Sequence, residues 1–329
     1  MKSIVSVVIL MVVCCSLQAQ RVTNLRAEQS GQDIVILYLL ESKSTCEVEL
    51  FLSIDNGFSW SVLNQSVSGD IGKNISKGEK RILWKVLDER QELEGNNIKF
   101  KIVVNGKKPF EPEMIFVEGG AFQMGSNSGD SDEKPLHYVS LSSFSIAKFE
   151  VTQAQYQAVM GINPSIFSDC ENCPVDNVSW NDVQIFIQKL NAQTGRSYRL
   201  PTEAEWDYAA KGGKKCKAYS YSGSHDINAS AWHNSNSERK SHHVGLKMPN
   251  ELGIYDMSGN VWEWCSDFYG PYNNFLETNP TGSVNGSQHV FRGGSWHFAQ
   301  EHCRISNRLG SNSDLKAIDG GFRLVLPVE

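Results

Sequence analysis

The residues best suited to chemistry lie close together near the C-terminus. Cys303 follows the Gly293-Gly294 turn, and His297 and His302 stand between them. A thiolate and an imidazole are both competent metal ligands, and a cysteine can also act as a nucleophile. The group therefore predicts either a mixed metal site or a reactive thiol. The alternative interpretation is a buried thiol beside solvated histidines.

Cys170 and Cys173 form a second cysteine group with C-x-x-C spacing. This spacing is typical of redox motifs that open a helix after a strand, and of zinc sites that use a second pair. The sequence offers neither context, so we expect a small loop disulfide before Pro174. The adjacent His242 and His243 point apart on an extended chain, which argues against a shared metal.

Motifs of other enzyme classes are absent from the sequence. It contains no glycine-rich phosphate loop, no G-x-S-x-G elbow and no H-E-x-x-H helix. The formal net charge of -6 and the pI near 5.8 argue against a surface that binds polyanions. Nucleic acid is therefore not an expected partner.

Residues 1–20 have the pattern of a signal peptide, with one lysine before an apolar run that ends at Cys15. The run is too short to span a membrane, so we expect no transmembrane segment. The mature protein would be periplasmic, displayed at the cell surface or secreted. Lipid attachment at Cys14 or Cys15 is the alternative. Of the eight cysteines, two fall in this segment, and the remaining six permit disulfides in an oxidising compartment.

The 329 residues have room for two domains, and a hydrophobic content of 40% is enough for real cores. Short alternating apolar runs predict an immunoglobulin-like β-sandwich over residues 21–107. Within it, Ser53 to Trp60 fits the pattern S-x-D-x-G-x-x-W, which we interpret as a structural hairpin. Residues 105–109 read as a linker.

Residues 112–329 form the second predicted domain. Three reciprocal capping boxes predict helix starts at Thr152, Ser179 and Thr202. Gly161 and Gly195 stand where the first two helices should end. The middle helix carries one apolar stripe with i, i+3, i+4, i+7 spacing, made of Val183, Phe186, Ile187 and Leu190.

Several blocks of this domain resemble the sulfatase-modifying-factor family. They are PVDNVSW (174–180), RLPTEAEW (199–206), GNVWEW (259–264), RGGSW (292–296) and GFRL (321–324). The resemblance covers roughly residues 112–326. It implies an α+β fold related to C-type lectins, with much irregular structure. The best-known member is the formylglycine-generating enzyme, a copper oxidase that converts a cysteine of sulfatases to formylglycine.

The resemblance also locates the copper ligands of that oxidase, two cysteines five residues apart. The corresponding positions here are Phe298 and Cys303. One thiolate and one phenyl ring cannot make a linear Cu(I) site, so we expect neither copper nor oxidase activity. If chemistry remains, Cys303 would be the nucleophile of an oxidoreductase of the formylglycine-generating type. Family geometry also brings Cys265 near Cys303, so a disulfide between them stays open.

Four positions match those at which the family binds calcium: Asp256, Gly259, Val261 and Glu263. They would supply two side-chain oxygens and two backbone carbonyls within eight residues, and Ca²⁺ takes several oxygens at flexible angles. We expect a structural Ca²⁺ here. The alternative is that both carboxylates cap turns or form ion pairs.

The resemblance implies that the loop after residue 295 lines the substrate cleft. We therefore expect a module of the cell envelope that binds a protein or a small molecule. A further alternative is a binding protein diversified by a retroelement, since similar domains vary between the RGGSW and GFRL blocks. The residues expected to line the cleft are Ser295, Trp296, Phe298, His302, Cys303, Ser311 and Asn312.

Overall fold

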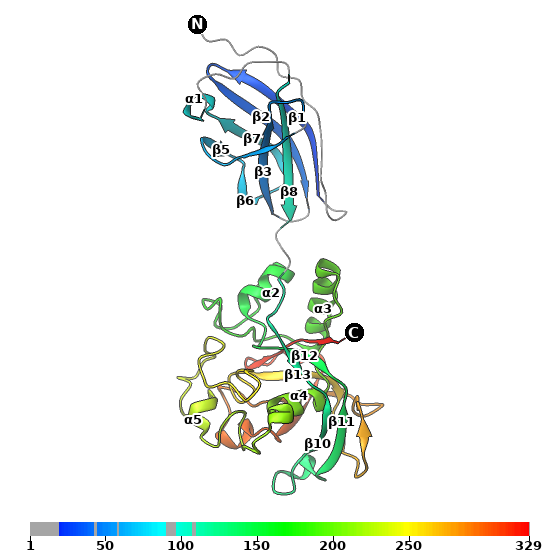
Figure 1. The fold of residues 1–329 in the computed structure, drawn as a ribbon. Helices are drawn as coiled ribbons and strands as arrows, with labels where there is room; N and C mark the ends of the chain where they lie inside the picture. The colour runs from blue at the N-terminus through cyan, green and yellow to red at the C-terminus, as the bar shows by residue number, and fades with distance from the viewer. Residues whose placement is uncertain (1–19, 43–44, 58, 90–96, 107–109, 329) are drawn as a thin grey trace. The chain divides into compact units, whose positions relative to one another are not determined.

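The computed structural model describes residues 20–42, 45–57, 59–89, 97–106 and 110–328 (Figure 1). The predicted signal peptide, apart from its last residue, and most of the predicted linker lie outside these ranges. The chain divides into two compact units, Met1–Lys108 and Pro109–Glu329. No helix among the described residues is long and apolar enough to cross a membrane.

The first unit consists of two antiparallel sheets that share one apolar core. The strands are β1 (Gln20–Ser30), β2 (Asp33–Ser42), β3 (Cys46–Ser53), β4 (Ser61–Leu63), β5 (Val67–Gly69), β6 (Gly72–Ile75), β7 (Gly78–Trp84) and β8 (Lys99–Gly106), with one short helix, α1 (Val86–Glu89). One sheet has the order β1-β2-β7-β5, and in the other β3 pairs with β4, β6 and β8. Ile36, Leu50 and Phe100 are fully buried in the shared core. The alternating apolar pattern produced these strands, because every second side chain faces that core.

The S-x-D-x-G-x-x-W segment forms a turn that its own side chains hold. Asp55 Oδ1 accepts from the Ser53 hydroxyl at 2.7 Å and from the Ser59 amide at 2.9 Å. The Gly57 amide donates to Ser53 Oγ at 2.8 Å. All of these side-chain groups serve the turn itself, which supports the structural interpretation of this motif.

The second unit is a mixed α+β domain with more strands than helices. Its strands are β9 (Met114–Val117), β10 (Gly120–Met124), β11 (His137–Leu141), β12 (Phe144–Ala147), β13 (Trp262–Phe268), β14 (Glu277–Thr278), β15 (Gln288–Arg292), β16 (Arg308–Asn312), β17 (Gly320–Gly321) and β18 (Val325–Pro327). They make three small sheets, β10-β11-β14, β18-β12-β9 and β16-β15-β13-β17. The helices are α2 (Gln153–Met160), α3 (Trp180–Thr194), α4 (Glu203–Ala210) and α5 (Ile227–Ser230), with 3₁₀ turns η1 (Ser131–Glu133), η2 (Gly213–Lys215) and η3 (Gln300–Cys303). Within this unit, α2 and α3 lie together at the end opposite β10 and β11 (Figure 1).

The predicted helix signals are confirmed. Each of Thr152, Ser179 and Thr202 caps its helix in a reciprocal capping box. Gly161 and Gly195 end α2 and α3 in the left-handed conformation. The apolar stripe of α3 is buried, as its spacing predicts.

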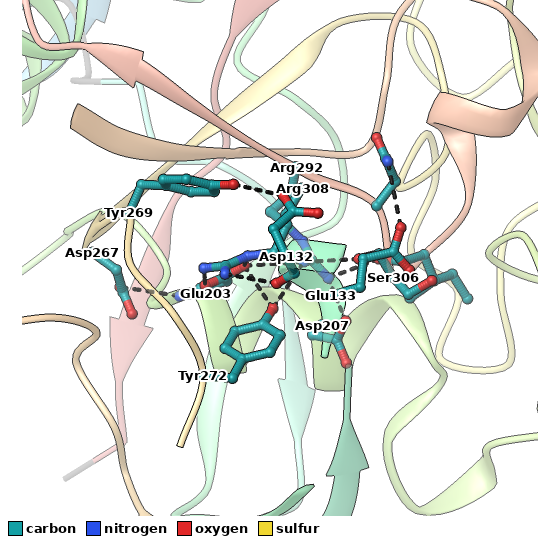
Figure 2. Close-up of polar contacts among 12 residues, drawn as sticks. Asp132, Glu133, Glu203, Asp207, Asp267, Tyr269, Tyr272, Arg292, Ser306 and Arg308 are labelled. Atoms are coloured by element: carbon teal, nitrogen blue, oxygen red, sulfur yellow. Dashed lines mark hydrogen bonds and ion pairs between the residues drawn. The ribbon is translucent and has the colours of Figure 1, made fainter. Parts of the chain in front are cut away.

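Helix α4 brings charged side chains into the interior, where they meet two arginines (Figure 2). Arg292 ends β15 and Arg308 begins β16, and the two are direct cross-strand partners. Like charges opposite each other in a sheet repel, and this pair is also shielded from water. A group of opposite charge must therefore lie between them.

Glu203 supplies that charge. Its carboxylate accepts from Arg308 Nε at 2.7 Å and Nη2 at 2.6 Å, and from Arg292 Nη1 at 3.0 Å. Asp207, one turn later on α4, binds Arg292, and the Tyr272 hydroxyl donates to Glu203 at 2.9 Å. Burial alone would raise the pKa of Glu203, but Arg308 and Arg292 hold it below its ordinary value. The network therefore stays charged and ties α4 to both strands.

The same network fixes the two ends of the segment 293–307, which carries most of the predicted cleft. Arg292 and Arg308 flank this segment directly. Near the C-terminal end of the segment, Arg304 donates two hydrogen bonds to the Glu133 carboxylate, of 2.7 and 3.0 Å. Asn307 Nδ2 donates to Asp130 at 3.2 Å, so the connection between β10 and β11 also holds the segment.

We predict that Glu203→Gln destabilises the protein by about 3–5 kcal/mol, because it leaves two buried arginines without their shared carboxylate. Urea unfolding of the second unit measures the effect. The matched control is Glu118→Gln, which removes an exposed ion pair with Lys214 and should change stability by less than about 0.5 kcal/mol. A Glu203→Gln protein as stable as this control would contradict the role given to the network.

Candidate functional site

The predicted cleft begins at a turn that only glycine can form. Gly294 has a φ of +74°, and a Cβ atom there would meet the His302 carbonyl oxygen at 2.6 Å and the Cys303 amide nitrogen at 2.9 Å. The turn therefore presses the start of the segment 295–303 against its end. It brings Ser295 and Cys303 together although they are eight positions apart in the sequence.

Ser295 and Trp296 are buried rather than displayed on a surface. The Ser295 hydroxyl donates to Asp319 Oδ2 at 2.5 Å. The Trp296 carbonyl accepts from Ser237 Oγ at 2.8 Å, and its ring lies edge-on to Phe167 at 6.0 Å. The Trp296 indole nitrogen has no hydrogen-bond partner in the protein. This end of the segment is packed between two other loops.

Phe298 stands where the oxidase has the first of its two copper-binding cysteines, and here it is a packing residue. Its ring is half-buried and lies edge-on to Trp262 at 5.5 Å and to His302 at 5.2 Å. It belongs to the apolar contacts around the core that includes Trp262. A phenyl ring offers no lone pair to a metal, so the residues here do not fit the copper site of the oxidase.

Cys303 is sealed from solvent. Its exposed fraction is 0%, and it packs with Ile227, Ala231 and Tyr221 in a small apolar cluster. Burial raises the pKa of the Cys303 thiol to about 12. The thiolate is the form that attacks electrophiles and binds metals, so at neutral pH this group is the unreactive thiol.

The structure contradicts a disulfide between Cys303 and Cys265, and it does not group Cys303 with the nearby histidines as three metal ligands. Cys265 and Cys303 are both free and buried, so no disulfide joins them. His297 is exposed, and His302 packs on Phe298. The one group of three or more metal-ligating side chains within the described ranges includes none of these residues.

Ser311 and Asn312 lie outside the segment 295–303, and their strand partners are residues of β15. Both are in β16, where Ser311 pairs with His289 and Asn312 with Gln288 of β15. Ser311 is buried and Asn312 is exposed. Among the residues expected to line the cleft, the accessible side chains are therefore those of Phe298, His302 and Asn312.

Two of the four predicted calcium positions, Asp256 and Glu263, belong to a cluster of buried charges. Asp256 Oδ2 accepts from the Gly245 amide at 2.7 Å, whereas Oδ1 has no partner in the protein. Both oxygens of Glu263 accept from Arg323 at 2.6 Å. One carboxylate is thus neutralised by a guanidinium, and the other keeps a free oxygen. The residues fit a cation at Asp256 better than at Glu263.

Sequence reasoning missed a third carboxylate in this cluster. Glu150 is buried, accepts from Asn260 Nδ2 at 2.7 Å and accepts from the Val261 amide at 3.2 Å. Burial, together with the neighbouring acids, raises the pKa of Glu150 well above its ordinary value, and burial raises that of Asp256 to about 6. Glu150 stands just before the capping box of α2, and only its apolar neighbours marked it as a buried position.

Two other features lie outside the predicted cleft. The expected disulfide between Cys170 and Cys173 is confirmed. A groove of about 850 Å³ is lined by residues that include Phe122, Tyr208 and Arg304 and by none of the predicted cleft residues. The exposed thiol of Cys216 also faces this groove.

Comparison with known proteins agrees with this fold and its motifs. Residues 99–328 match the model of the "Sulfatase-modifying factor enzyme 1-like domain", a range that begins in β8 of the first unit. The chain is 32% identical over 274 residues to chaperone protein LppX of Paenibacillus barcinonensis, covering 65% of this chain and 91% of that one. It is 33% identical over 170 residues to the formylglycine-generating enzyme of Streptomyces coelicolor, covering 46% of this chain and 52% of the enzyme.

The fold of the second unit is also similar to that of a solved structure. Treponema denticola variable protein 1 superimposes with a TM-score of 0.62 at 31% identity, over 65% of this chain and 95% of that one. The second unit is thus a mixed α+β domain of the formylglycine-generating-enzyme type. The chain belongs to the sulfatase-modifying-factor family, and the resemblance found in the sequence is confirmed.

Proposed function

We propose that the protein is an exported, non-oxidase member of its family that binds a ligand or partner in the cell envelope. The observation that carries this proposal is the state of the two copper positions. Phe298 is a packing residue, and Cys303 is a thiol whose pKa is raised to about 12 by burial. A copper oxidase needs two accessible thiolates for a soft metal, and this chain presents none at these positions.

Accessible apolar side chains beside the cleft support a binding role. Ile162, Ile166 and Phe167 are exposed by 62, 51 and 42%, and Phe167 contacts Trp296. Close to them, the indole nitrogen of Trp296 and Asp176 Oδ2 are buried without a protein partner. Binding sites combine apolar surface with a few polar groups of this kind.

The finer assignments of fold and location belong to the same proposal. The two antiparallel sheets of the first unit support an immunoglobulin-like sandwich, and the irregular second unit supports a relation to C-type lectins. The pattern of residues 1–20 supports export to the periplasm, the cell surface or the medium. The similarity to a protein named as a chaperone supports a role that needs no oxidation.

We predict that the purified protein, supplied with Cu(I) and oxygen, leaves the cysteine of a sulfatase-motif peptide unchanged. Mass spectrometry of the peptide detects conversion, and oxygen uptake provides a second readout. An active formylglycine-generating enzyme is the positive control. Peptide oxidation that disappears in Cys303→Ser would restore the oxidoreductase of the formylglycine-generating type and refute this proposal.

Structural calcium at Asp256, Gly259, Val261 and Glu263 is part of the proposal. The unpartnered Oδ1 of Asp256 supports it, because a buried carboxylate oxygen otherwise lacks compensation for the water it has lost. The raised pKa of Glu150 favours its neutral form without a cation, and a nearby Ca²⁺ would favour its ionised form, while Arg323 already balances Glu263. A calcium ion would balance the remaining charge with hard oxygen ligands.

We predict that Ca²⁺ raises the thermal midpoint of the second unit and that Asp256→Asn abolishes this response. Binding only to the folded state should stabilise it by about 2.7 kcal/mol when free Ca²⁺ is 100 times the dissociation constant. Scanning calorimetry with Ca²⁺ or a chelator measures the shift. The exposed Asp314→Asn control should respond like the wild type. Equal midpoints of the wild type with and without Ca²⁺ would exclude the site.

A second candidate function is favoured by one comparison. The similarity to Treponema denticola variable protein 1 supports a binding surface that is diversified by a retroelement. Sequencing the DNA beside the gene tests this possibility. A near-identical repeat that differs from the gene at adenines would establish it, and the lack of such a repeat would remove it.

A further inference from the structure

The fold brings a histidine to the C-x-x-C loop from about 70 positions away. The sulfur atoms of Cys170 and Cys173 and a ring nitrogen of His243 all lie within 4.8 Å of one another. Cys173 is buried, Cys170 is half-buried and His243 is exposed. Two sulfurs and an imidazole at such separations are a ligand set for a borderline metal ion.

Hydrogen bonds hold the cysteine loop in addition to the disulfide. The Cys173 carbonyl accepts from the Gln153 amide at 2.9 Å, and the Glu171 carbonyl accepts from the Ala154 amide at 3.0 Å. Both donors are in the first turn of α2, whose amides lack partners within the helix. The loop is thus anchored to α2 independently of the sulfur–sulfur bond.

The segment that carries His243 is also fixed beside this loop. The Val244 amide donates to the Asn172 carbonyl at 3.0 Å, which joins the two segments directly. On either side of His243, the His242 amide donates to Asn260 Oδ1 and the Gly245 amide to Asp256 Oδ2. Neither the loop nor the histidine segment has to move far for three ligands to reach one ion.

We propose that Cys170, Cys173 and His243 bind one Zn²⁺ ion when the disulfide is reduced. A dithiol transfers two electrons and two protons to the sulfur–sulfur bond and itself becomes a disulfide. Zn²⁺ then displaces the two thiol protons and takes neutral imidazole as its third ligand, with water as the fourth. The oxidised pair offers no thiolate, so the disulfide and the metal site are two exclusive states of one loop.

A change between the disulfide state and the zinc state would alter the position of the loop beside the predicted binding surface. Phe167, three residues before Cys170, is the exposed aromatic residue that contacts Trp296. A zinc ion would also tie the loop to the segment of His243 through a bond that the disulfide does not make. The inference itself stands on the geometry of the three ligands and does not depend on the proposed function.

The test uses the full chain with Cys216→Ser, because Cys216 is the one exposed free thiol among the described cysteines. The protein is reduced with a phosphine, which becomes a phosphine oxide, and is then desalted without oxygen. Competition with a chromophoric chelator gives the zinc affinity and stoichiometry. Co²⁺ serves as a spectroscopic probe, because thiolate ligation produces charge-transfer absorption. His243→Ala and His243→Gln test the histidine, and the exposed His225→Ala is the matched control.

The expected result is one equivalent of zinc in the reduced protein and none in the oxidised protein. Both His243 variants should bind at least tenfold more weakly, while His225→Ala binds as the parent does. Thermal midpoints of the oxidised variants show that each is folded. Zinc affinity that His243 variants retain, zinc binding without reduction, or Co²⁺ spectra without thiolate ligation would each overturn the inference.

Discussion

Two arginines that face each other across a strand pair impose the constraint on which the second unit depends. Arg292 and Arg308 are buried at the base of the segment that carries the family's characteristic residues, and neither can remain there without a counter-charge. Glu203 of α4 satisfies both at once. Two carboxylates of α4 therefore position the helix against the strands, Glu203 shared by both arginines and Asp207 bound to Arg292, in a domain whose small sheets could not specify the arrangement alone.

This constraint helps to explain why Cys303 lies in the interior and why Phe298 is half-buried. The turn at Gly294 folds the segment back on itself, and the network holds both of its ends. Between them, Phe298 packs against Trp262 and Cys303 is shielded by apolar neighbours. Family membership fixes the scaffold, but the chemistry depends on which atoms that scaffold presents, and here the two copper positions present a phenyl ring and a buried thiol.

Local rules in the sequence predicted local structure well. The capping boxes at Thr152, Ser179 and Thr202 and the disulfide of Cys170 and Cys173 depend on residues three positions apart, which the sequence displays directly. The pairing of Glu203 with Arg308 and the approach of His243 to the C-x-x-C loop depend on the whole topology. No periodicity in the sequence reports such contacts, so the sequence alone did not reveal the histidine that the fold places beside the two cysteines. The burial of Ser295 and Trp296 was hidden for the same reason, whereas a buried Cys303 was one of the two interpretations that the sequence left open.

The accessibility of the Cys303 thiol tests the central claim most directly. Native protein is treated with iodoacetamide at pH 8, and peptide mass spectrometry compares the labelling of Cys303 with that of the exposed Cys216. Because burial raises the pKa of Cys303 to about 12, almost no thiolate forms at this pH. The account predicts that Cys216 is labelled while Cys303 reacts only after denaturation. Labelling of Cys303 in the folded protein at a rate similar to that of Cys216 would contradict it.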